Sequence, residues 1–276
     1  MKTYSGLFEK LISIENLELA YQKARKGKFN TKAIQEFDAH YQLYLIQLRL
    51  ELKSRAYAPA QLKTFILRDP KTRTISVSQF RDRVVHHALV NVLQPIFEPR
   101  FIYDSYASRK GKGTLAALKR FDCFLKKVTR NGTLAPGARD RNIVASFVFK
   151  ADIKSYFDSV DHRVLMQIIC KHVKDSDVLW LVERILGNHN SGISGKGMPL
   201  GNWTSQFFAN VYLNELDQFV KHVLKVKYYL RYVDDFVILH RSKTTLQEYE
   251  LQIKLFLQVL KLELHPLKCK IVPIRG

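Results

Sequence analysis

The chain has 276 residues, which is enough to bury a sizeable hydrophobic core in one large domain or two small ones. Its 45 Lys and Arg residues against 25 Asp and Glu residues give a formal net charge of +20, far beyond what solubility requires. This excess favours a nucleic-acid partner over a merely solvated basic surface. It also disfavours a membrane-facing surface, because no basic amphipathic helix with a Trp or Phe face is evident.

The spacing of the cysteines and the length of the apolar runs indicate the cellular compartment. The three cysteines lie far apart and lack the paired spacing of a zinc site or a disulfide framework, so a reducing interior fits best. No stretch approaches the ~18 consecutive apolar residues of a membrane span. We therefore expect a cytoplasmic protein without a membrane partner.

Helices and one hairpin are predicted for the N-terminal part of the chain. Thr31 is expected to cap a long amphipathic helix over residues 32–57, where apolar side chains recur every three or four positions. Two short apolar segments around an Asp-Pro-Lys turn predict a hairpin over residues 62–77. Ser78 is then expected to cap a helix that ends at Gln94, just before a proline.

The chain next turns strongly basic. Residues 106–130 carry a single acid, Asp122, among many lysines and arginines. Three cations at the start of this region are candidates for contacts with nucleic acid: Arg109, Lys110 and Lys112. A turn-rich loop over residues 131–142 precedes an apolar strand that ends by delivering Asp152.

The C-terminal half alternates helices with a hairpin. Helices are predicted over residues 161–173, 176–186, 204–224 and 246–264, the last with a capping box formed by Thr245 and Glu248. Together with the strands around them, they favour an α+β domain with an antiparallel sheet.

Two adjacent carboxylates, Asp234 and Asp235, interrupt a run that otherwise reads as a buried strand, YYLRYVDDFVILH. Inside a strand they would point to opposite faces, and an unpaired buried carboxylate is costly. The pattern favours a hairpin turn at Val-Asp-Asp with arms over residues 228–232 and 236–239. An ordinary surface turn fits the same pattern.

Asp152 gives these carboxylates a companion, because it also ends an apolar strand. If the two strands are neighbours in one sheet, Asp152 and Asp234 converge on the same edge. Converging carboxylates in a strongly basic protein suit two Mg²⁺ ions ~3.5–4 Å apart, which activate an attacking hydroxyl and stabilise the leaving oxygen in phosphoryl transfer.

Several motifs in order resemble the palm of reverse transcriptases: ADIKSYFDSVDH, GMPLGNWTSQFFANVYLNELDQFVKH, RYVDDFVIL and LELHPLKCKI. The upstream FRDRVVHHALVNVLQPIFEPRFIYDSYASRKGKGTLAAL resembles the fingers of the bacterial and group II intron type. The resemblance implies a right-hand polymerase with an N-terminal helical region at 1–60, fingers at 61–149 and a palm at 150–276. The family's chain continues into a helical thumb, which we expect to be missing or truncated here.

The resemblance also implies a metal site. Asp152 and Asp234 match the two metal-binding aspartates, with the Ile153 carbonyl as a further ligand and Asp235 as the third carboxylate. The implied cofactor is a pair of Mg²⁺ ions, for which Mn²⁺ can substitute.

Nucleotide-binding positions follow from the same motifs. Phe157 matches the aromatic gate that clashes with a ribonucleotide 2′-OH, although a core aromatic fits the segment too. Arg73 matches the fingers arginine that grips the triphosphate, with Lys71 or Arg68 assisting, and Lys268 matches the late palm lysine. Solvated surface cations are the alternative for these last assignments.

The segment LGNWTSQ departs from the common pattern of Gln-Gly, three residues and Ser-Pro, since Leu200 replaces the Gln and Gln206 replaces the Pro. With Gly201, Asn202 and Ser205 it resembles the reverse transcriptases of diversity-generating retroelements. That family copies a template-repeat RNA into cDNA with errors at template adenines, together with a small basic accessory protein. An apolar side chain in place of an amide loosens the check on base-pair geometry, because a lost polar contact is worth about 1–3 kcal/mol.

The implied activity is RNA-directed DNA polymerisation on a primer and an RNA template with dNTPs. A group II intron-like or defence-associated reverse transcriptase is the nearest alternative. A catalytically weak RNA-binding scaffold is the alternative from another class, and the intact carboxylates argue against it.

Overall fold

The computed structural model describes residues 2–27, 31–68, 72–129 and 144–275. The chain divides into two compact units, and each is built from two separate stretches of sequence. The first unit comprises Met1–Arg100 and Val160–Phe208, and the second comprises Phe101–Ser159 and Ala209–Gly276.

Helices make up most of the first unit. Its centre is α5 (Phe80–Phe97), which buries side chains on most of its circumference, and α2 (Ile14–Arg25) packs along it. The other helical elements of this unit are α1 (Leu7–Leu11), α3 (Lys32–Ala39), α4 (Tyr41–Lys53), the 3₁₀ turn η1 (Glu98–Arg100), α8 (His162–Cys170), α9 (Ser176–Gly187) and the beginning of α10 (Trp203–Gln218).

The first unit also carries the predicted hairpin. β1 (Lys63–Leu67) pairs antiparallel with β2 (Arg73–Val77), with Lys63 opposite Val77. The hairpin prediction is therefore confirmed, although its turn lies outside the described residues.

The second unit is built on a four-stranded antiparallel sheet. Its strands are ordered β4-β5-β3-β6. Their bounds are β3 (Val144–Asp152), β4 (Tyr228–Tyr232), β5 (Asp235–His240) and β6 (Lys270–Arg275). The helical elements around it are α6 (Thr114–Thr129), α7 (Tyr156–Ser159), the rest of α10, the π-helical turn η3 (Phe219–Val223) and α11 (Lys243–Val259).

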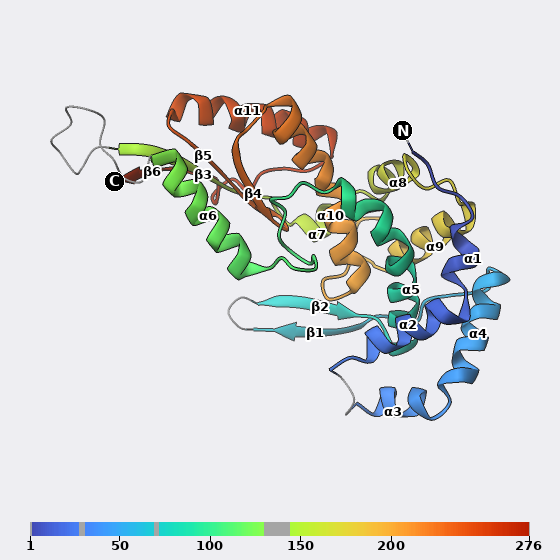
Figure 1. Ribbon diagram of the computed structural model, residues 1–276. Helices are drawn as coiled ribbons and strands as arrows, with labels where there is room; N and C mark the ends of the chain where they lie inside the picture. The colour runs from blue at the N-terminus through green and yellow to red at the C-terminus, as the bar shows by residue number, and fades with distance from the viewer. Residues whose placement is uncertain (1, 28–30, 69–71, 130–143, 276) are drawn as a thin grey trace. The chain divides into compact units, whose positions relative to one another are not determined.

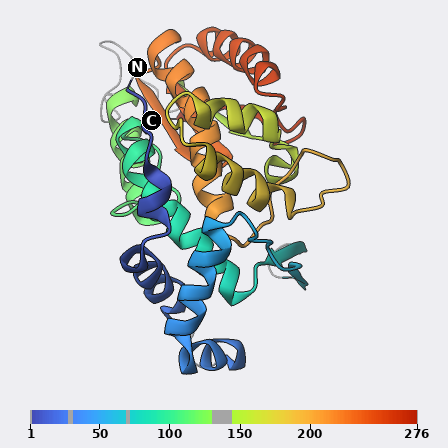
Figure 2. The same ribbon diagram turned by 90° about the vertical axis from the view of Figure 1, so that its right-hand side faces the viewer.

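Helices cover both faces of this sheet (Figures 1 and 2). Because successive strand residues point to opposite faces, Val148 and Leu239 meet Phe124 of α6 in one hydrophobic cluster. Phe236 and Ile238 alternate with that set and are buried on the other face. The predicted α+β class with an antiparallel sheet is confirmed.

The single helix predicted over residues 32–57 is wrong, because the chain breaks at His40 (φ −136°, ψ 31°) into α3 and α4. The apolar period continues across the break, so the pattern alone could not reveal it. Tertiary contacts explain it, since Phe37 and Tyr41 both stack on Tyr21 with ring centroids 5.7 and 5.1 Å away. Asp38, just before the break, accepts a hydrogen bond from the Tyr21 hydroxyl at 2.5 Å.

The predicted bounds of the next helix are also wrong. Gln79, not Ser78, is the N-cap of α5, and the backbone N–H of Ser78 instead donates to Asn202 Oδ1 at 2.9 Å. Pro95 lies inside the helix rather than after it. A proline in the last turn removes one hydrogen bond, and the burial of Ile96 and Phe97 carries the helix past it.

Thr245 does not cap the last helix. The helix α11 begins at Lys243, and Ser242 is its N-cap, accepting a hydrogen bond from the backbone N–H of Thr245 at 3.2 Å. The cap therefore lies three residues before the predicted position, in the same serine–threonine class.

Among the described residues, no helix is long and apolar enough to cross a bilayer.

Candidate active site

The sheet register sets two carboxylates directly opposite each other. β3 pairs antiparallel with β5, so Asp152 lies opposite Asp235, and the neighbouring pair Tyr232–Asp235 closes the β4–β5 hairpin. Val233 and Asp234 are its two turn residues. The predicted hairpin turn is confirmed at Val233 and Asp234, whereas Asp235 is already the first residue of β5, and the two carboxylate-bearing strands are neighbours. Three carboxylates therefore gather at one end of the sheet.

Backbone contacts fix this end of the sheet on both sides of Asp152. The N–H of Ile153 donates to the carbonyl of Asp234 at 3.3 Å, which ties the strand end to the hairpin turn. The carbonyl of Asp152 accepts from the N–H of His265 at 2.8 Å and from the thiol of Cys269 at 3.7 Å. The main chain that carries the carboxylates is thus held by its neighbours on either side.

The hairpin turn contains a strained residue. Val233 has φ 54°, in the left-handed region that β-branched side chains rarely adopt. Such a conformation costs about 1–3 kcal/mol and persists only where the surroundings impose it. The guanidinium of Arg231 supplies one such constraint, because its Nη1 donates to the Val233 carbonyl at 2.9 Å.

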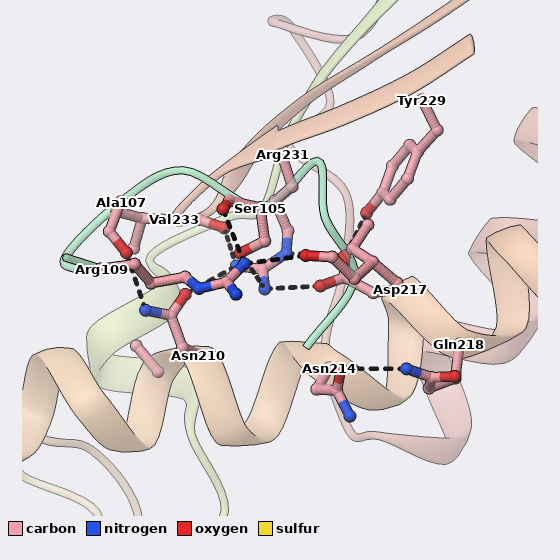
Figure 3. A network of polar contacts seen from close by, with 12 residues as sticks. Ser105, Ala107, Arg109, Asn210, Asn214, Asp217, Gln218, Tyr229, Arg231 and Val233 are labelled. Carbon is pink, nitrogen blue, oxygen red and sulfur yellow. Dashed lines mark hydrogen bonds and ion pairs between the residues drawn. The ribbon is translucent and has the colours of Figure 1, made fainter. Parts of the chain in front are cut away.

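Arg231 itself is completely buried and forms a bidentate ion pair with Asp217 of α10 (Figure 3). Its Nε and Nη2 donate to the two carboxylate oxygens of Asp217 at 2.8 and 2.7 Å. The hydroxyl of Tyr229 donates to the same carboxylate at 2.7 Å. Although burial opposes the charge, the paired carboxylate raises the pKa of Arg231, so the guanidinium stays protonated.

The remaining donors of Arg231 reach the loop at the start of the second unit and helix α10. Its Nη2 donates to Ser105 Oγ at 3.2 Å, and its Nη1 donates to Asn210 Oδ1 at 3.3 Å. The backbone of Ser105 runs beside β4 as a parallel bridge to Arg231. Asn210 in turn donates to the carbonyl of Ala107 at 2.9 Å (Figure 3). One guanidinium therefore joins a helix, a strand, a loop and the carboxylate-bearing turn.

The three carboxylates are crowded. Desolvation, and then the like charges of Asp234 and Asp152, raise the pKa of Asp235 to about 6, although part of its side chain is exposed. Lys268 offsets part of this charge, because its Nζ lies 3.0 and 2.8 Å from the two carboxylate oxygens of Asp152. That contact raises the pKa of Lys268.

A divalent cation fits this donor set. Carboxylate oxygens are the ligands that Mg²⁺ prefers, and a cation would relieve the repulsion that raises the Asp235 pKa. Among the described residues, however, no group of three or more His, Cys, Asp or Glu side chains is placed so that it could hold a metal ion by itself. A metal here would therefore need additional oxygen ligands, such as the Ile153 carbonyl or substrate phosphates.

The two aromatic residues after Asp152, Tyr156 and Phe157, differ in burial. Tyr156 is fully buried and donates its hydroxyl hydrogen to the carbonyl of Ala209 at 2.9 Å, so it is the core aromatic of this segment. Phe157 is only half-buried and packs edge-on against Tyr156, with ring centroids 5.5 Å apart. The gate assignment of Phe157 stays a prediction.

The LGNWTSQ segment lies in the first unit, against the hairpin strand β2. The N–H of Ser76 donates to the carbonyl of Leu200 at 3.1 Å. Gly201 has φ +121°, and a Cβ there would meet Ile75 Cγ2 at 3.0 Å and Val77 Cγ1 at 3.2 Å. Glycine suits this position, because the backbone angle would strain any other residue and a Cβ would press on two side chains of β2.

Some polar residues after Gly201 contact other parts of the protein, and one lines a cavity. The side-chain oxygen of Asn202 is used by the Ser78 N–H, and Ser205 is buried. Gln206 lines a cavity of about 410 Å³ together with Trp203 and Arg83. The nucleic-acid role predicted for Asn202, Ser205 and Gln206 stays a prediction.

The predicted cations differ in how much of their charge the protein uses. Arg109 donates to the carbonyls of Ile102 and Ser105 at 2.8 and 2.9 Å, and Lys112 donates to the carbonyl of Tyr103 at 2.8 Å. These two side chains therefore shape their own loop. Three others are exposed: Arg68, Arg73 and Lys110. Lys71 lies outside the described residues.

Sequence reasoning missed Arg231 and Asp217. The signal was present, because Arg231 stands between apolar neighbours in YYLRYV and Asp217 follows the buried Leu213 by one helical step of four. A charge at an apolar-periodic position on two separate elements indicates a buried pair.

Comparison with protein families gives one match over most of the chain. The family model described as reverse transcriptase (RNA-dependent DNA polymerase) matches residues 67–275. Protein YkfC of Escherichia coli K12 is 28% identical over 180 residues, which are 63% of this chain and 44% of that protein. The group II intron-encoded protein LtrA of Lactococcus lactis is 26% identical over 238 residues, 82% of this chain and 37% of that protein. The chain thus spans less than half the length of these relatives.

Solved structures show the same fold. Apo telomerase of Candida tropicalis, truncated from its C-terminal domain, matches with a TM-score of 0.56 at 14% identity, over 80% of this chain and 51% of that one. The longer apo telomerase matches with a TM-score of 0.54 at 13% identity, over 86% of this chain and 50% of that one.

We predict that Arg231→Met lowers the free energy of unfolding by about 3–5 kcal/mol, because it leaves Asp217 as an unpaired buried charge. The double variant Arg231→Met/Asp217→Leu should recover most of that loss, because no uncompensated charge remains. The exposed Arg55–Asp177 pair supplies the control, and Arg55→Met should cost less than about 1 kcal/mol. Urea unfolding checks this, and equal effects of the two arginine substitutions would contradict it.

We also predict that Asp235→Asn raises the melting temperature of the metal-free protein at neutral pH. A raised folded-state pKa means that the protonated form stabilises the fold; this stability is full below pH ~4. It is lost as the pH rises through about 6. The gain from Asn should therefore be small at pH 4.5 and larger at pH 7.5 in thermal melts with EDTA. A gain that shrinks with rising pH would refute the charge repulsion.

Proposed function

Because this chain belongs to the reverse transcriptase family, we propose that it is an RNA-directed DNA polymerase. The observation that carries the proposal is the register that sets Asp152 opposite Asp235, beside a turn that bears Asp234. In the proposed reaction the primer 3′-oxygen attacks the α-phosphorus of a dNTP. A new P–O bond forms, the α–β bridging P–O bond breaks, and pyrophosphate and a proton are released.

Asp152, Asp234, Asp235 and the carbonyl of Ile153 would hold the divalent cations. Two Mg²⁺ ions, or Mn²⁺ in their place, would supply activation of the 3′-hydroxyl and neutralisation of the leaving oxygen. Lys268 now neutralises Asp152. With cations held by the carboxylates, the Lys268 ammonium would be available for the triphosphate.

Side chains from several motifs are the proposed nucleotide-binding residues. In the second unit, the half-exposed Phe157 would exclude a 2′-hydroxyl. In the first unit, the exposed Arg73 would grip the triphosphate, with Lys71 or Arg68 assisting. Leu200 and Gly201 would form the floor under the base pair, since Gly201 allows the backbone to approach β2 without a side chain between them.

Cations and polar groups from several motifs are the proposed contacts to template RNA. In the first unit these are Asn202, Ser205 and Gln206, with the cavity of about 410 Å³ beside Trp203. In the second unit they are Arg109, Lys110 and Lys112. The net charge of +20 supports this partner, because phosphate contacts supply most of the affinity for nucleic acid.

We further propose that the enzyme is of the diversity-generating retroelement type, working with a small basic accessory protein. The LGNWTSQ segment, with Leu200 and Gln206, supports this finer assignment. The second candidate is a group II intron-like reverse transcriptase, which the 26% identity to LtrA over 82% of this chain supports. Error rates separate the two.

Primer extension on an RNA template with Mg²⁺ and dNTPs tests the polymerase. Asp234→Asn should lower the rate at least about 100-fold, because a metal ligand supplies several kcal/mol of transition-state stabilisation. The exposed Asp122→Asn in the same unit is the control and should extend like the wild type. Extension that survives Asp234→Asn, or an inactive wild type that still binds RNA, would favour the scaffold alternative.

Sequencing of the cDNA tests the branch. The wild type should misincorporate mainly opposite template adenines, and Leu200→Gln should reduce those errors about 5- to 150-fold, because a restored polar contact is worth about 1–3 kcal/mol of discrimination. Ile75→Val, in the same unit, controls for repacking near the Leu200–Gly201 backbone. A faithful wild type would move the enzyme to the group II intron-like type.

A further inference from the structure

A second cavity lies in the second unit, at the end of the sheet opposite the carboxylates. We call it the distal pocket. Its volume is about 300 Å³, enough for one nucleotide, and its lining is Lys127, Val128, Val226, Lys227, Tyr228, Leu239, His240, Arg241 and Tyr249. β5 runs from Asp235 to His240, so at ~3.3 Å per residue the pocket lies roughly 17 Å from the carboxylates.

Rigid elements fix the side chains of the distal pocket. The Nε of Arg241 donates to the carbonyl of Val128 at 2.8 Å, in the last turn of α6, where helix carbonyls lack partners within the helix. This bond joins the end of α6 to the end of β5 and sets the plane of the guanidinium. The ring of His240 accepts from the N–H of Ser242 at 3.0 Å and packs edge-on against Tyr249.

Among the described residues, cations dominate the charge of the distal pocket. None of its described lining residues is acidic, and no described carboxylate pairs with the exposed Lys127, Lys227 or Arg241. More exposed lysines stand beside the lining in the chain: Lys126, Lys225 and Lys243. Like charges gathered in a concave site raise the local potential and concentrate anions there.

Flat aromatic groups accompany the cations. Tyr228 and Tyr249 line the pocket and are only half-buried, and the ammonium of Lys227 lies 5.5 Å from the Tyr228 ring centroid. Cations for phosphates together with rings for bases are the combination that binds single-stranded nucleic acid. An acidic peptide would use the cations and leave the rings without a stacking partner.

We propose that the distal pocket binds the phosphodiester backbone of an RNA strand. The proposal rests on the proposed function, because it takes the RNA to be part of the template molecule. Lys127, Lys227 and Arg241 contact phosphates, and Tyr228 or Tyr249 stacks on a base. A site roughly 17 Å from the carboxylates anchors RNA outside the copied base pair. It holds the template without occupying the polymerising edge of the sheet.

Fluorescence anisotropy with a labelled 20-nucleotide RNA of mixed sequence tests the proposal, with wild type beside Lys127→Ala/Lys227→Ala. Two lost single-strand phosphate contacts lower the slope of log K against log salt by about 1.4 and weaken binding roughly 25-fold at 0.1 M salt. The control Lys10→Ala/Lys53→Ala removes the same charge from exposed lysines in the last turns of α1 and α4. It should bind within about twofold of the wild type.

The outcomes separate this inference from the proposed function. If the two double variants bind RNA alike while the wild type extends primers, the distal pocket is not an RNA site and the polymerase stands. If the wild type neither binds the RNA nor extends a primer, both proposals fall. A labelled ten-residue polyglutamate peptide that binds as tightly as the RNA and is lost with Lys127→Ala/Lys227→Ala would overturn the inference in favour of an acidic protein partner.

Discussion

The buried pair of Arg231 and Asp217 is the interaction on which the carboxylate end of the second unit depends. Taking two charges out of water is expensive, and a well-packed apolar pair of the same volume often stabilises a fold as well or better. Stability alone therefore does not account for the pair. Its geometry does, because the same guanidinium that grips Asp217 also holds the carbonyl of the strained Val233, next to Asp234.

The crowding of three carboxylates at one end of the sheet has an electrostatic cost. The register that brings Asp152 and Asp235 together places like charges side by side, which raises the pKa of Asp235 to about 6. Lys268 offsets only part of the repulsion, from a half-exposed position. A divalent cation bound by these carboxylates would relieve that repulsion, so the crowding that raises the pKa of Asp235 would also favour metal binding.

The sequence predicted the parts of this fold that local patterns determine. The hairpin at Val-Asp-Asp, the strand ending at Asp152 and the antiparallel sheet all follow from alternation and turn chemistry. The break at His40 was not predicted, because contacts with Tyr21 override the local helical pattern. The continuation of α5 past Pro95 was not predicted either, because the burial of Phe97 overrides the local proline signal. The ion pair of Arg231 with Asp217 was not predicted, because a strand pattern indicates which residue is buried but not which distant residue pairs with it.

Because of the π-helical turn Phe219–Val223, the position of Arg231 in β4 depends on the exact number of residues before the strand. The N–H of Leu224 bonds to the carbonyl of Phe219, five residues back, so this turn holds one more residue than an α-helical turn spanning the same rise. Only four residues separate that turn from β4. Since strand side chains alternate, a one-residue deletion there would move Arg231 to the face of α6, away from Asp217. Insertions and deletions, more than substitutions, should therefore be purged from this segment during evolution.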